Sequence, residues 1–249
     1  MSTSVAVCIA GQARLTDAAK AAVVGKLLEP LRRSGMTVDV YVHMWNNQSF
    51  DRKVWEEGTR MDDAAIRTWL ADLNPVDVHL QAPINFFKQP IKIRAPLREA
   101  PTYESQYYSL EVARNLMRRG EQKRGRKYDR LIKTRIDLIY RNDFDPSWLT
   151  AGREVLCIPD REGHKWDGDI QPPRWSPVWW MPDQLWAGSR DAVDFLMSFR
   201  EAFHPSYVGA KEVCSIERML YRHYRPHRKK WPIKRIPLLY KIEKTANNK

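Results

Sequence analysis

Apolar residues in the first part of the chain follow two patterns, one typical of buried strands and the other of helices. Short apolar runs at Ser4–Ala10 and Thr37–Met44 predict two strands, and Thr16–Arg33 between them has the end signals of a helix that stops at Gly35. Pro30 should kink this helix or end it early, because proline has no N–H to donate. A strand, a helix and a second strand in this order predict a parallel sheet.

The same patterns predict further elements along the rest of the chain. The expected helices are Asp62–Asp72, Tyr103–Arg124, Ser189–Phe203 (with Ser189 as its cap) and Glu212–His223, and the expected strands are Asp77–Leu80, Arg130–Ile139, Glu154–Ile158 and Gln184–Ala187. Two proline-rich segments without periodicity, Gln81–Pro101 and Pro159–Pro182, are expected to be loops. We therefore expect one α/β domain over residues 1–224, with a mixed, mostly parallel sheet flanked by helices.

The composition agrees with a folded domain. The chain has 249 residues, of which 43% are hydrophobic, enough for a sizeable core and too many for a wholly disordered chain. No run of about 18 apolar residues predicts a spanning helix, and the N-terminus lacks the basic start and apolar stretch of a signal peptide. Cys8, Cys157 and Cys214 are far apart, which fits reduced thiols in a cytoplasmic protein better than a zinc site or a disulfide framework.

The net charge of +12 is concentrated near the C-terminus. Arg222–Lys249 holds ten lysines and arginines and one glutamate, a net charge of +9. A chain built to bind nucleic acid would be more evenly basic, so nucleic acid is not an expected partner.

The residues after 224 predict a basic, amphipathic tail, 225–249, outside the domain. Arg228–Tyr240 mixes basic with large apolar residues, and each lysine or arginine near an anionic bilayer contributes about 1 kcal/mol. We therefore expect residues 226–244 to bind an anionic membrane surface, which would make the protein peripheral on the inner face of the membrane. One alternative is a basic tail that packs on the domain, and nucleic-acid binding ranks third.

The segment Lys127–Arg141, KYDRLIKTRIDLIYR, is the most informative part of the chain. It has the apolar pairs of a buried strand, interrupted by ionised side chains that are seldom buried unless they are paired. Arg135 and Asp137 are two residues apart, so in a strand they share a face. Asp137 could coordinate a hard divalent cation, Mn²⁺ or Mg²⁺, that holds a diphosphate, and Arg135 could neutralise phosphate or brace Asp137. The alternative is an internal ion pair that only organises the sheet.

The turn after the first expected strand is a second candidate for phosphate binding. Gly11 permits unusual backbone angles, and Arg14 offers a fork of donors to a phosphate. The turn matches neither the glycine pattern of dinucleotide-binding folds nor a Walker loop. An ordinary strand-to-helix turn with a surface arginine is an equally good interpretation.

The expected loop before residue 182 is unusually rich in tryptophan. Five of the ten tryptophans lie between residues 166 and 186, and indole faces suit the apolar faces of sugar rings. The residues that we expect to bind a sugar acceptor are Trp166, Trp175, Trp179, Trp180 and Asp183. A cap over the core and a protein-binding patch are the alternatives.

Two acidic residues near this loop are candidates for a catalytic role. Asp183 could accept a proton from an acceptor hydroxyl as a general base, and Glu217 in the following helix is the competing candidate. For either acid, a solvated or capping role is nearly as good an interpretation. Asp167-Gly168-Asp169 has the spelling of a metal motif but stands in the expected loop, away from a strand end.

Four blocks of residues together resemble a known family. The blocks are AGQAR (10–14), DVYVHMW (39–45), YDRLIKTRIDL (128–138) and DQLWAGS (183–189). Residues from about 5 to 220 resemble GT-A-type glycosyltransferases, of the poorly characterised kind found in bacterial surface-polysaccharide loci and large DNA viruses. The resemblance implies a Rossmann-like, GT-A-like fold that binds a nucleotide-sugar.

The resemblance also implies where the nucleotide-sugar binds. Gly11, Gln12 and Arg14 fall at the nucleotide-binding turn, and Arg135 and Asp137 fall where typical members have an acid-x-acid metal motif. The first acid of that motif is Arg135 here, so a positive charge could replace part of the role of the metal.

These observations predict a metal-assisted or arginine-assisted glycosyltransferase of polysaccharide biosynthesis. It would move a sugar from a nucleotide-sugar donor to a hydroxyl of a polysaccharide or lipid-linked glycan. Two other classes stay open: another transferase with a phosphate-bearing donor, such as a sulfotransferase, and a non-catalytic carbohydrate- or nucleic-acid-binding protein.

Overall fold

The computed structural model describes residues 2–46, 61–84, 86, 100–152, 154–160, 181–201 and 216–242. These residues form a seven-stranded sheet in the order β3-β2-β1-β4-β7-β6-β8 and a two-stranded sheet of β5 and β9. Strands β1 to β4 are parallel, β7 is antiparallel to both β4 and β6, and β8 is parallel to β6. The predicted α/β class, with a mixed and mostly parallel sheet, is confirmed.

Most of the described elements lie close to their predicted positions. The strands are β1 Ser4–Gln12, β2 Thr37–Trp45, β3 Pro75–Gln81, β4 Arg130–Thr134, β5 Leu138–Tyr140, β6 Leu156–Pro159, β7 Trp186–Ser189, β8 Ile233–Ile236 and β9 Tyr240–Ile242. The helices are α1 Asp17–Val23, α2 Glu29–Arg33, α3 Asp63–Leu70, α4 Ala100–Arg124, α5 Ser147–Thr150, α6 Arg190–Met197 and α8 Ile216–Tyr224, with shorter helical turns η1 Val24–Leu28, η4 Ala71–Leu73 and η7 Arg225–His227.

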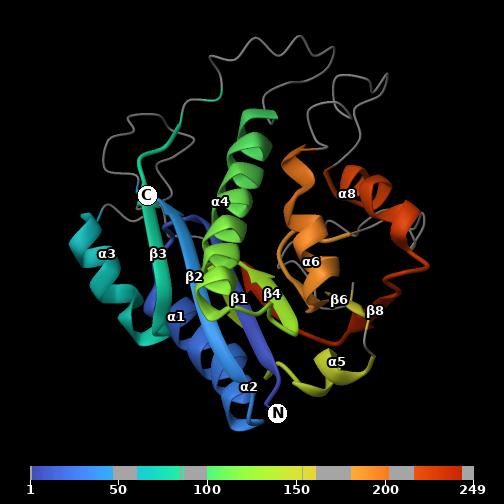
Figure 1. Ribbon diagram of the computed structural model, residues 1–249. Helices are drawn as coiled ribbons and strands as arrows, with labels where there is room; N and C mark the ends of the chain where they lie inside the picture. The colour runs from blue at the N-terminus through green and yellow to red at the C-terminus, as the bar shows by residue number, and fades with distance from the viewer. Residues whose placement is uncertain are drawn as a thin grey trace.

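Helices cover both faces of the large sheet (Figure 1). Successive residues of β1 point to opposite faces, as the period of a strand requires. Val5, Val7 and Ile9 pack with α1, α2 and α3 in one apolar core, whereas Ala6 and Cys8 pack with α4, α6 and α8 in the other. Burial of β1 on both faces explains its nearly continuous apolar sequence.

Helix α4 lies very close to the sheet, and one glycine allows this. A Cβ atom at Gly120 would stand 1.9 Å from the Oη of Tyr41 on β2. Tyr41 is 1% exposed and its hydroxyl hydrogen-bonds to that of Tyr128, at 2.6 Å. The absence of a side chain at this position therefore sets the distance between α4 and the sheet.

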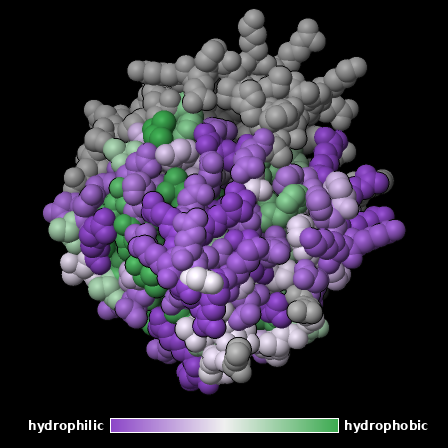
Figure 2. Space-filling model, in the orientation of Figure 1, coloured by the Kyte–Doolittle hydropathy of each residue, from purple (hydrophilic) through white to green (hydrophobic). Residues whose placement is uncertain are grey.

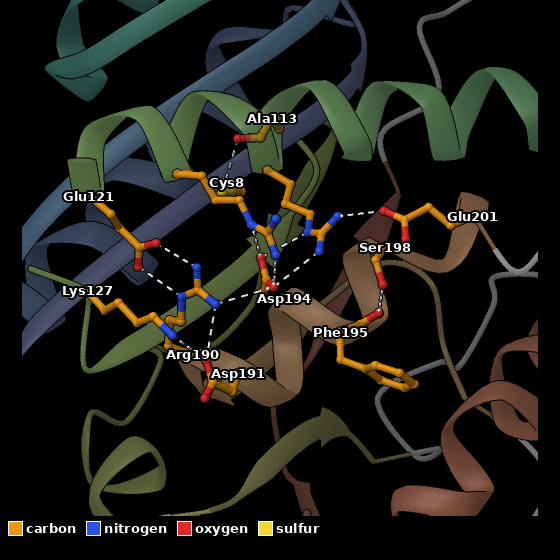
Figure 3. A network of polar contacts seen from close by, with 12 residues as sticks. Cys8, Ala113, Glu121, Lys127, Arg190, Asp191, Asp194, Phe195, Ser198 and Glu201 are labelled. Carbon is orange, nitrogen blue, oxygen red and sulfur yellow. Dashed lines mark hydrogen bonds and ion pairs between the residues drawn. The ribbon is translucent and has the colours of Figure 1, made fainter. Parts of the chain in front are cut away.

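A buried network of ion pairs joins α6 to α4 (Figure 3). The carboxylate of Asp194 accepts hydrogen bonds from Arg114 at 2.9 Å and Arg118 at 2.6 Å, and Arg190 contacts Glu121 at 2.6 Å and Asp194 at 3.3 Å. Burial alone would raise the pKa of Asp194, but its arginine partners outweigh burial and lower it. The network fixes α6, and the end of β7 that precedes it, against α4.

The helix predicted at Thr16–Arg33 forms over its whole length, with an irregularity before Pro30. Thr16 caps α1, and its Oγ1 accepts a hydrogen bond from the N–H of Ala19 at 3.2 Å. The turn Val24–Leu28 is wound as a π-helix, so that the N–H of Glu29 bonds to the carbonyl of Val24. Pro30 has no N–H to donate, and the wider turn beside it absorbs this loss without ending the helix.

The strand predicted over Arg130–Ile139 is broken, and this corrects the sequence interpretation. Strand β4 ends at Thr134, a turn follows, and Leu138–Tyr140 is β5, paired antiparallel with β9 in the second sheet. Arg135 and Asp137 therefore lie in the turn and not on one face of a strand. The apolar periodicity continued through the turn because Ile136 is itself buried there.

The described C-terminal segment differs from the predicted tail. Strand β8 extends the large sheet beside β6, and β9 pairs with β5. Trp231, Ile236 and Leu238, which we expected to enter a membrane, are at most 5% exposed within the protein. Apolar residues alternating with basic ones therefore indicated edge strands here, because such strands bury one face and leave the other in solvent.

Some smaller predictions can also be compared with the structure. Ser189 precedes α6 as expected, but its side chain makes no capping hydrogen bond. Cys8 and Cys157 are buried free thiols. No helix among the described residues is long and apolar enough to cross a membrane. Cys214, most of the segment Gln81–Pro101 and residues 161–180 lie outside the described residues.

Candidate functional site

The order of the strands reverses at the boundary between β1 and β4. The chain proceeds from β1 to β2 and β3 on one side, then returns through α4 to β4 on the other side of β1. Ligands of open α/β sheets bind beyond the carboxyl ends of the strands at such a switch point. Five predicted site residues lie at these ends: Gly11 and Gln12 are the last two residues of β1, Arg14 lies in the turn after β1, and Arg135 and Asp137 lie in the turn after β4.

Two arginines meet on one carboxylate at this boundary. Arg135 binds Asp137 with two hydrogen bonds, at 2.8 Å from Nε to Oδ1 and at 2.6 Å from Nη2 to Oδ2. Arg14 reaches the same Oδ2 from the turn after β1, at 3.2 Å. The predicted pair of Arg135 and Asp137 therefore forms, and the structure adds Arg14 as a third member.

The three side chains differ in their access to solvent. Asp137 is 3% exposed, whereas the side chains of Arg14 and Arg135 are 19% and 24% exposed. Burial alone would raise the pKa of Asp137, but the two guanidiniums outweigh burial and lower it, so the carboxylate stays ionised. The result is a buried anion that holds two cationic groups at the surface of the switch point.

This arrangement can bind phosphate. A guanidinium has five N–H donors in a planar fork that matches phosphate oxygens, and Arg135 uses two of its nitrogens on Asp137. Two arginines around one carboxylate leave a net positive charge, which favours an anionic ligand. The turn therefore has the chemistry expected for a diphosphate.

The carboxyl end of β1 leaves room for a ligand to approach the backbone. Gly11 has a φ of 137°, which disfavours any residue with a side chain, and no atom lies within 4 Å of the place where its Cβ would stand. The side-chain oxygen of Gln12 is buried and makes no hydrogen bond to the described residues. An unsatisfied buried acceptor beside an open backbone position is compatible with a bound group that donates a hydrogen bond.

The described cluster fits a divalent cation poorly. Both oxygens of Asp137 already accept hydrogen bonds from guanidiniums, and two cationic groups stand where a cation would have to bind. Across the described part of the chain, no group of three histidine, cysteine, aspartate or glutamate side chains could hold a metal ion. The predicted metal role of Asp137 stays a prediction, and no step proposed below depends on it.

Asp183, the candidate general base, lies in a turn before β7 and next to the arginine cluster. Its side chain accepts a hydrogen bond from Gln106 near the start of α4, and the residue is 7% exposed. Burial acts to lower the pKa of Arg135, but Asp137 and the nearby carboxylate of Asp183 raise it overall. The candidate base and the candidate phosphate-binding residues therefore share one site.

The turn that carries Asp183 is held from below by Lys133, near the end of β4. The Nζ atom of Lys133 donates to the backbone carbonyl of Asp183 and lies 3.4 Å from that of Gln184. It also lies 4.8 Å from the centroid of the Trp186 ring, and the Nε1 of Trp186 donates to the carbonyl of Pro182. Three successive carbonyls of this turn are thus bound by two buried side chains.

The C-terminal strand β9 reaches the same site. The Oη of Tyr240 donates to the side-chain oxygen of Gln184 at 3.4 Å, and its ring packs edge-on against Tyr140. Burial raises the pKa of Tyr240 well above its ordinary value, and the negative charge of Asp183 adds to the effect. A residue from the predicted tail therefore stands near the candidate base.

Sequence reasoning missed three residues of this site. Lys133 is one of the ionised residues in the apolar run Lys127–Arg141. A buried charge of this kind can indicate a functional residue, but the sequence pattern assigns Lys133 no role. Gln106 and Tyr240 gave no signal, because they reach Asp183 across 77 and Gln184 across 56 residues of sequence, respectively. Contacts between segments so far apart produce no periodic pattern in the sequence.

The remaining predicted site residues fall elsewhere or outside the described residues. Glu217 lies in the first turn of α8, which packs on α6. The residues outside the described part of the chain are Trp166, Trp175, Trp179, Trp180 and the Asp167-Gly168-Asp169 motif. Trp186 is described, and it is part of the core beneath Asp183.

His43 and Trp45, at the end of β2, have structural roles. His43 is fully buried, with its Nδ1 atom 2.6 Å from the hydroxyl of Ser109 and its Nε2 atom 3.4 Å from the side chain of Gln81. Burial lowers the pKa of His43 to about 4, so the ring is neutral at neutral pH. Trp45 is 1% exposed and stacks on Tyr108.

No protein-family model and no curated protein matches this chain. The function must therefore be inferred from the geometry at the switch point, together with the resemblance of the four sequence blocks. Both lead to the same five residues at the carboxyl end of β1 and in the turns that follow β1 and β4.

Proposed function

We propose that the protein is a GT-A-like glycosyltransferase, which moves a sugar from a nucleotide-sugar donor to a hydroxyl of a polysaccharide or lipid-linked glycan. The observation that carries the proposal is the cluster of Arg14, Arg135 and Asp137 at the carboxyl ends of β1 and β4. Its location suits a nucleotide and its charge suits a diphosphate. The four blocks that resemble glycosyltransferases contribute these same residues.

The phosphate-binding step follows from the charges of the cluster. As the bond between the anomeric carbon and the diphosphate oxygen breaks, negative charge develops on the leaving diphosphate. Guanidiniums fixed by Asp137 stabilise that charge without having to reorient, which lowers the barrier. Arg135 is held by two hydrogen bonds, so it is the better fixed of the two arginines.

Asp183 would complete an inverting reaction. The acceptor hydroxyl oxygen forms the new bond to the anomeric carbon, and its proton passes to the carboxylate of Asp183. Gln106 holds that carboxylate, and Lys133 holds the backbone of the same residue. A carboxylate positioned by two side chains beside a phosphate-binding cluster supports this assignment of the base.

The direct test is a thermal-shift screen of nucleotide-sugars, each with and without Mn²⁺, followed by a measurement of donor hydrolysis. A ligand that binds the folded state raises its stability by mass action, by about 2.7 kcal/mol at a concentration 100 times the Kd. We expect one nucleotide class to stabilise the protein and a slow release of nucleoside diphosphate without acceptor. Release of nucleoside diphosphate also separates a transferase from a binding module.

Arg135→Gln provides the variant for this test, and Arg33→Gln the matched control. Arg33 is 65% exposed on α2 and pairs with Glu29 and Asp143, neither of which belongs to the cluster of Arg14, Arg135 and Asp137. Stabilisation by the nucleotide-sugar should be lost in Arg135→Gln and kept in the control. The proposal is rejected if no nucleotide-sugar binds, or if Arg135→Gln binds one as well as the wild type does.

The C-terminal surface supports a further part of the proposal, attachment to an anionic membrane. Arg222, Arg225, Arg228, Lys229 and Lys230 are exposed, and no acidic residue occurs between residues 218 and 242. Figure 2 shows hydrophilic residues along the edge of the molecule where α8 and the following turn lie in Figure 1. Because the large apolar side chains of this segment are mostly buried, attachment would be electrostatic and would not depend on insertion.

A further inference from the structure

Lys133 is the most deeply buried cationic side chain at the switch point. It is 1% exposed, stands one residue before the end of β4, and points to the face of the sheet that α4 covers. Burial of an ammonium group is costly, and the cost is expected at positions where a function uses the charge or its hydrogen bonds. An apolar residue would fill the same space beside Trp186 without that cost.

The contacts of Lys133 all converge on the turn before β7. Its Nζ atom binds the carbonyls of Asp183 and Gln184 and lies over the Trp186 ring, and Trp186 binds the carbonyl of Pro182. Lys133 binds the main chain after the Cα of Asp183, and Trp186 binds the carbonyl before it, so together they limit where the carboxylate can point. The side chain of Asp183 then has one further support, from Gln106.

We infer that Lys133 is the positioning residue for Asp183: it holds the carbonyls of residues 183 and 184, next to the Pro182 carbonyl that Trp186 holds, so that the carboxylate faces the phosphate-binding cluster. This inference rests on the proposed function, because it assigns a purpose to the position of the proposed base. Lys133 does not touch donor or acceptor in this arrangement. It acts through the backbone of the turn.

The charge of Lys133 makes this positioning sensitive to pH. Burial lowers its pKa to about 7; Asp183 and Asp137 oppose this shift, and Arg135 adds to it. These are the charged groups around the ammonium, and Gln106 and Trp186 are the uncharged side chains that complete the turn. Below pH 7 the ammonium gives charge-assisted hydrogen bonds to the carbonyls, and above pH 7 the neutral amine binds them less strongly.

The first test does not require activity. Hydrogen–deuterium exchange of the backbone amides of residues 183–186 should be at least tenfold faster in Lys133→Met than in the wild type. Lys133→Gln, which keeps a donor, should restore part of the protection and serves if Lys133→Met does not fold. The matched control is Leu131→Ala, on the same strand and facing the same core, which should not loosen this turn selectively. Unchanged exchange in both Lys133 variants would overturn the inference.

The second test measures sugar transfer against pH. In the wild type, transfer should fall as the pH rises through about 7, and this limb should disappear in Lys133→Met, with kcat at least tenfold lower and donor binding kept. Leu131→Ala should keep the limb. Loss of donor binding equal to the loss of kcat would contradict a positioning role.

The two tests separate the inference from the proposed function. If the wild type neither binds nor hydrolyses any nucleotide-sugar, the proposed function fails, and the exchange measurement still decides whether Lys133 holds the turn. If donor binding and hydrolysis are found but the exchange of residues 183–186 is unaffected, the inference fails and the function stands.

Discussion

At the scale of single residues, the site depends on how a buried charge is compensated. Asp137 is almost inaccessible to water, yet it remains ionised because two guanidiniums contact it. Removing one partner of such a group leaves a buried charge without compensation, which is far more costly than losing an exposed ion pair. Substitutions here should therefore affect function and stability in ways that can be distinguished.

Asp137→Asn should lower sugar transfer by at least about 100-fold, because misplacement of a catalytic group by about 1 Å is enough for a loss of that size. The amide is close in shape to the carboxylate, so the circular dichroism spectrum should stay native. Asp143→Asn is the control, since Asp143 is 55% exposed and pairs with Lys26 and Arg33. A transfer rate close to that of the wild type would reject the role of Asp137.

The same variant has a defined pH dependence. The pKa of Asp137 is lowered in the folded state, so its charge stabilises the fold above the unfolded pKa, about 3.9. This stabilisation is lost as the pH falls through the folded-state pKa. The difference in free energy of unfolding between the wild type and Asp137→Asn should therefore shrink below about pH 4. Urea unfolding at several pH values measures it, and a constant difference would contradict the ion-pair assignment.

Lys133 should also make stability rise with pH, but in a higher pH range and because its burial penalises the charged form. Its pKa falls from 10.5 to about 7 on folding, so between these values the unfolded chain binds more protons than the folded protein. The wild type should gain stability as the pH rises from 7 to 10.5, and Lys133→Met should lack this gain. Equal pH slopes for the two proteins would show that Lys133 is not buried as described.

At the scale of elements, polar networks decide how the helices sit on the sheet. The Asp194 carboxylate on α6 forms ion pairs with Arg114 and Arg118 on α4 and with Arg190 on its own helix (Figure 3). These contacts hold α6 against α4. Since β7 leads directly into α6, this network also fixes one end of the strand beside the Asp183 turn. Packing of apolar faces alone would leave α6 freer to shift along α4.

Asp194→Asn should destabilise the protein by about 3–5 kcal/mol, the usual cost of leaving buried charged partners uncompensated. Asp191→Asn provides the control on the same helix: Asp191 is 55% exposed and also contacts Arg190, and its loss should cost less than about 1 kcal/mol. Thermal and urea unfolding measure both values. Equal effects would show that the network is not buried in solution.

At the scale of the whole molecule, the described residues 225–242 pack as part of the domain. Strand β8 completes the edge of the large sheet, and Ile236 and Leu238 are fully buried. A deletion of residues 226–249 would remove β8 and β9 and expose the core. A loss of membrane binding in such a variant could therefore not be attributed to the basic residues. Surface substitutions are the informative variants.

Replacing Arg228, Lys229 and Lys230 together by serine should weaken binding to anionic vesicles by about 100-fold, since each basic residue contributes about 1 kcal/mol. The melting temperature should stay the same, because all three are exposed. The control replaces Lys26, Arg33 and Arg119, which carry the same charge elsewhere. Binding should also weaken with salt. Equal binding by the two triple variants would refute a specific surface, as would preferential binding to nucleic acid over vesicles.

The amino-acid sequence by itself determined the class of fold and pointed to the residues of the cluster that we propose to bind phosphate. Apolar periodicity depends on neighbours a few positions apart, so it located β1, β2, α3, α4 and the run that becomes β4. The spacing of Arg135 and Asp137 also pointed to their pairing, although the strand assumed for them ends one residue earlier.

Tertiary structure alone decided the rest. Arg14 meets Asp137 across 123 residues of sequence, and Lys133 meets the Asp183 turn across 50, because the strand order places their segments side by side. Whether Ile236 and Leu238 face a membrane or a core is likewise not encoded in their local pattern. A membrane and a core would both bury this apolar surface. The core location follows from the edge of β6, because its backbone groups form hydrogen bonds with β8.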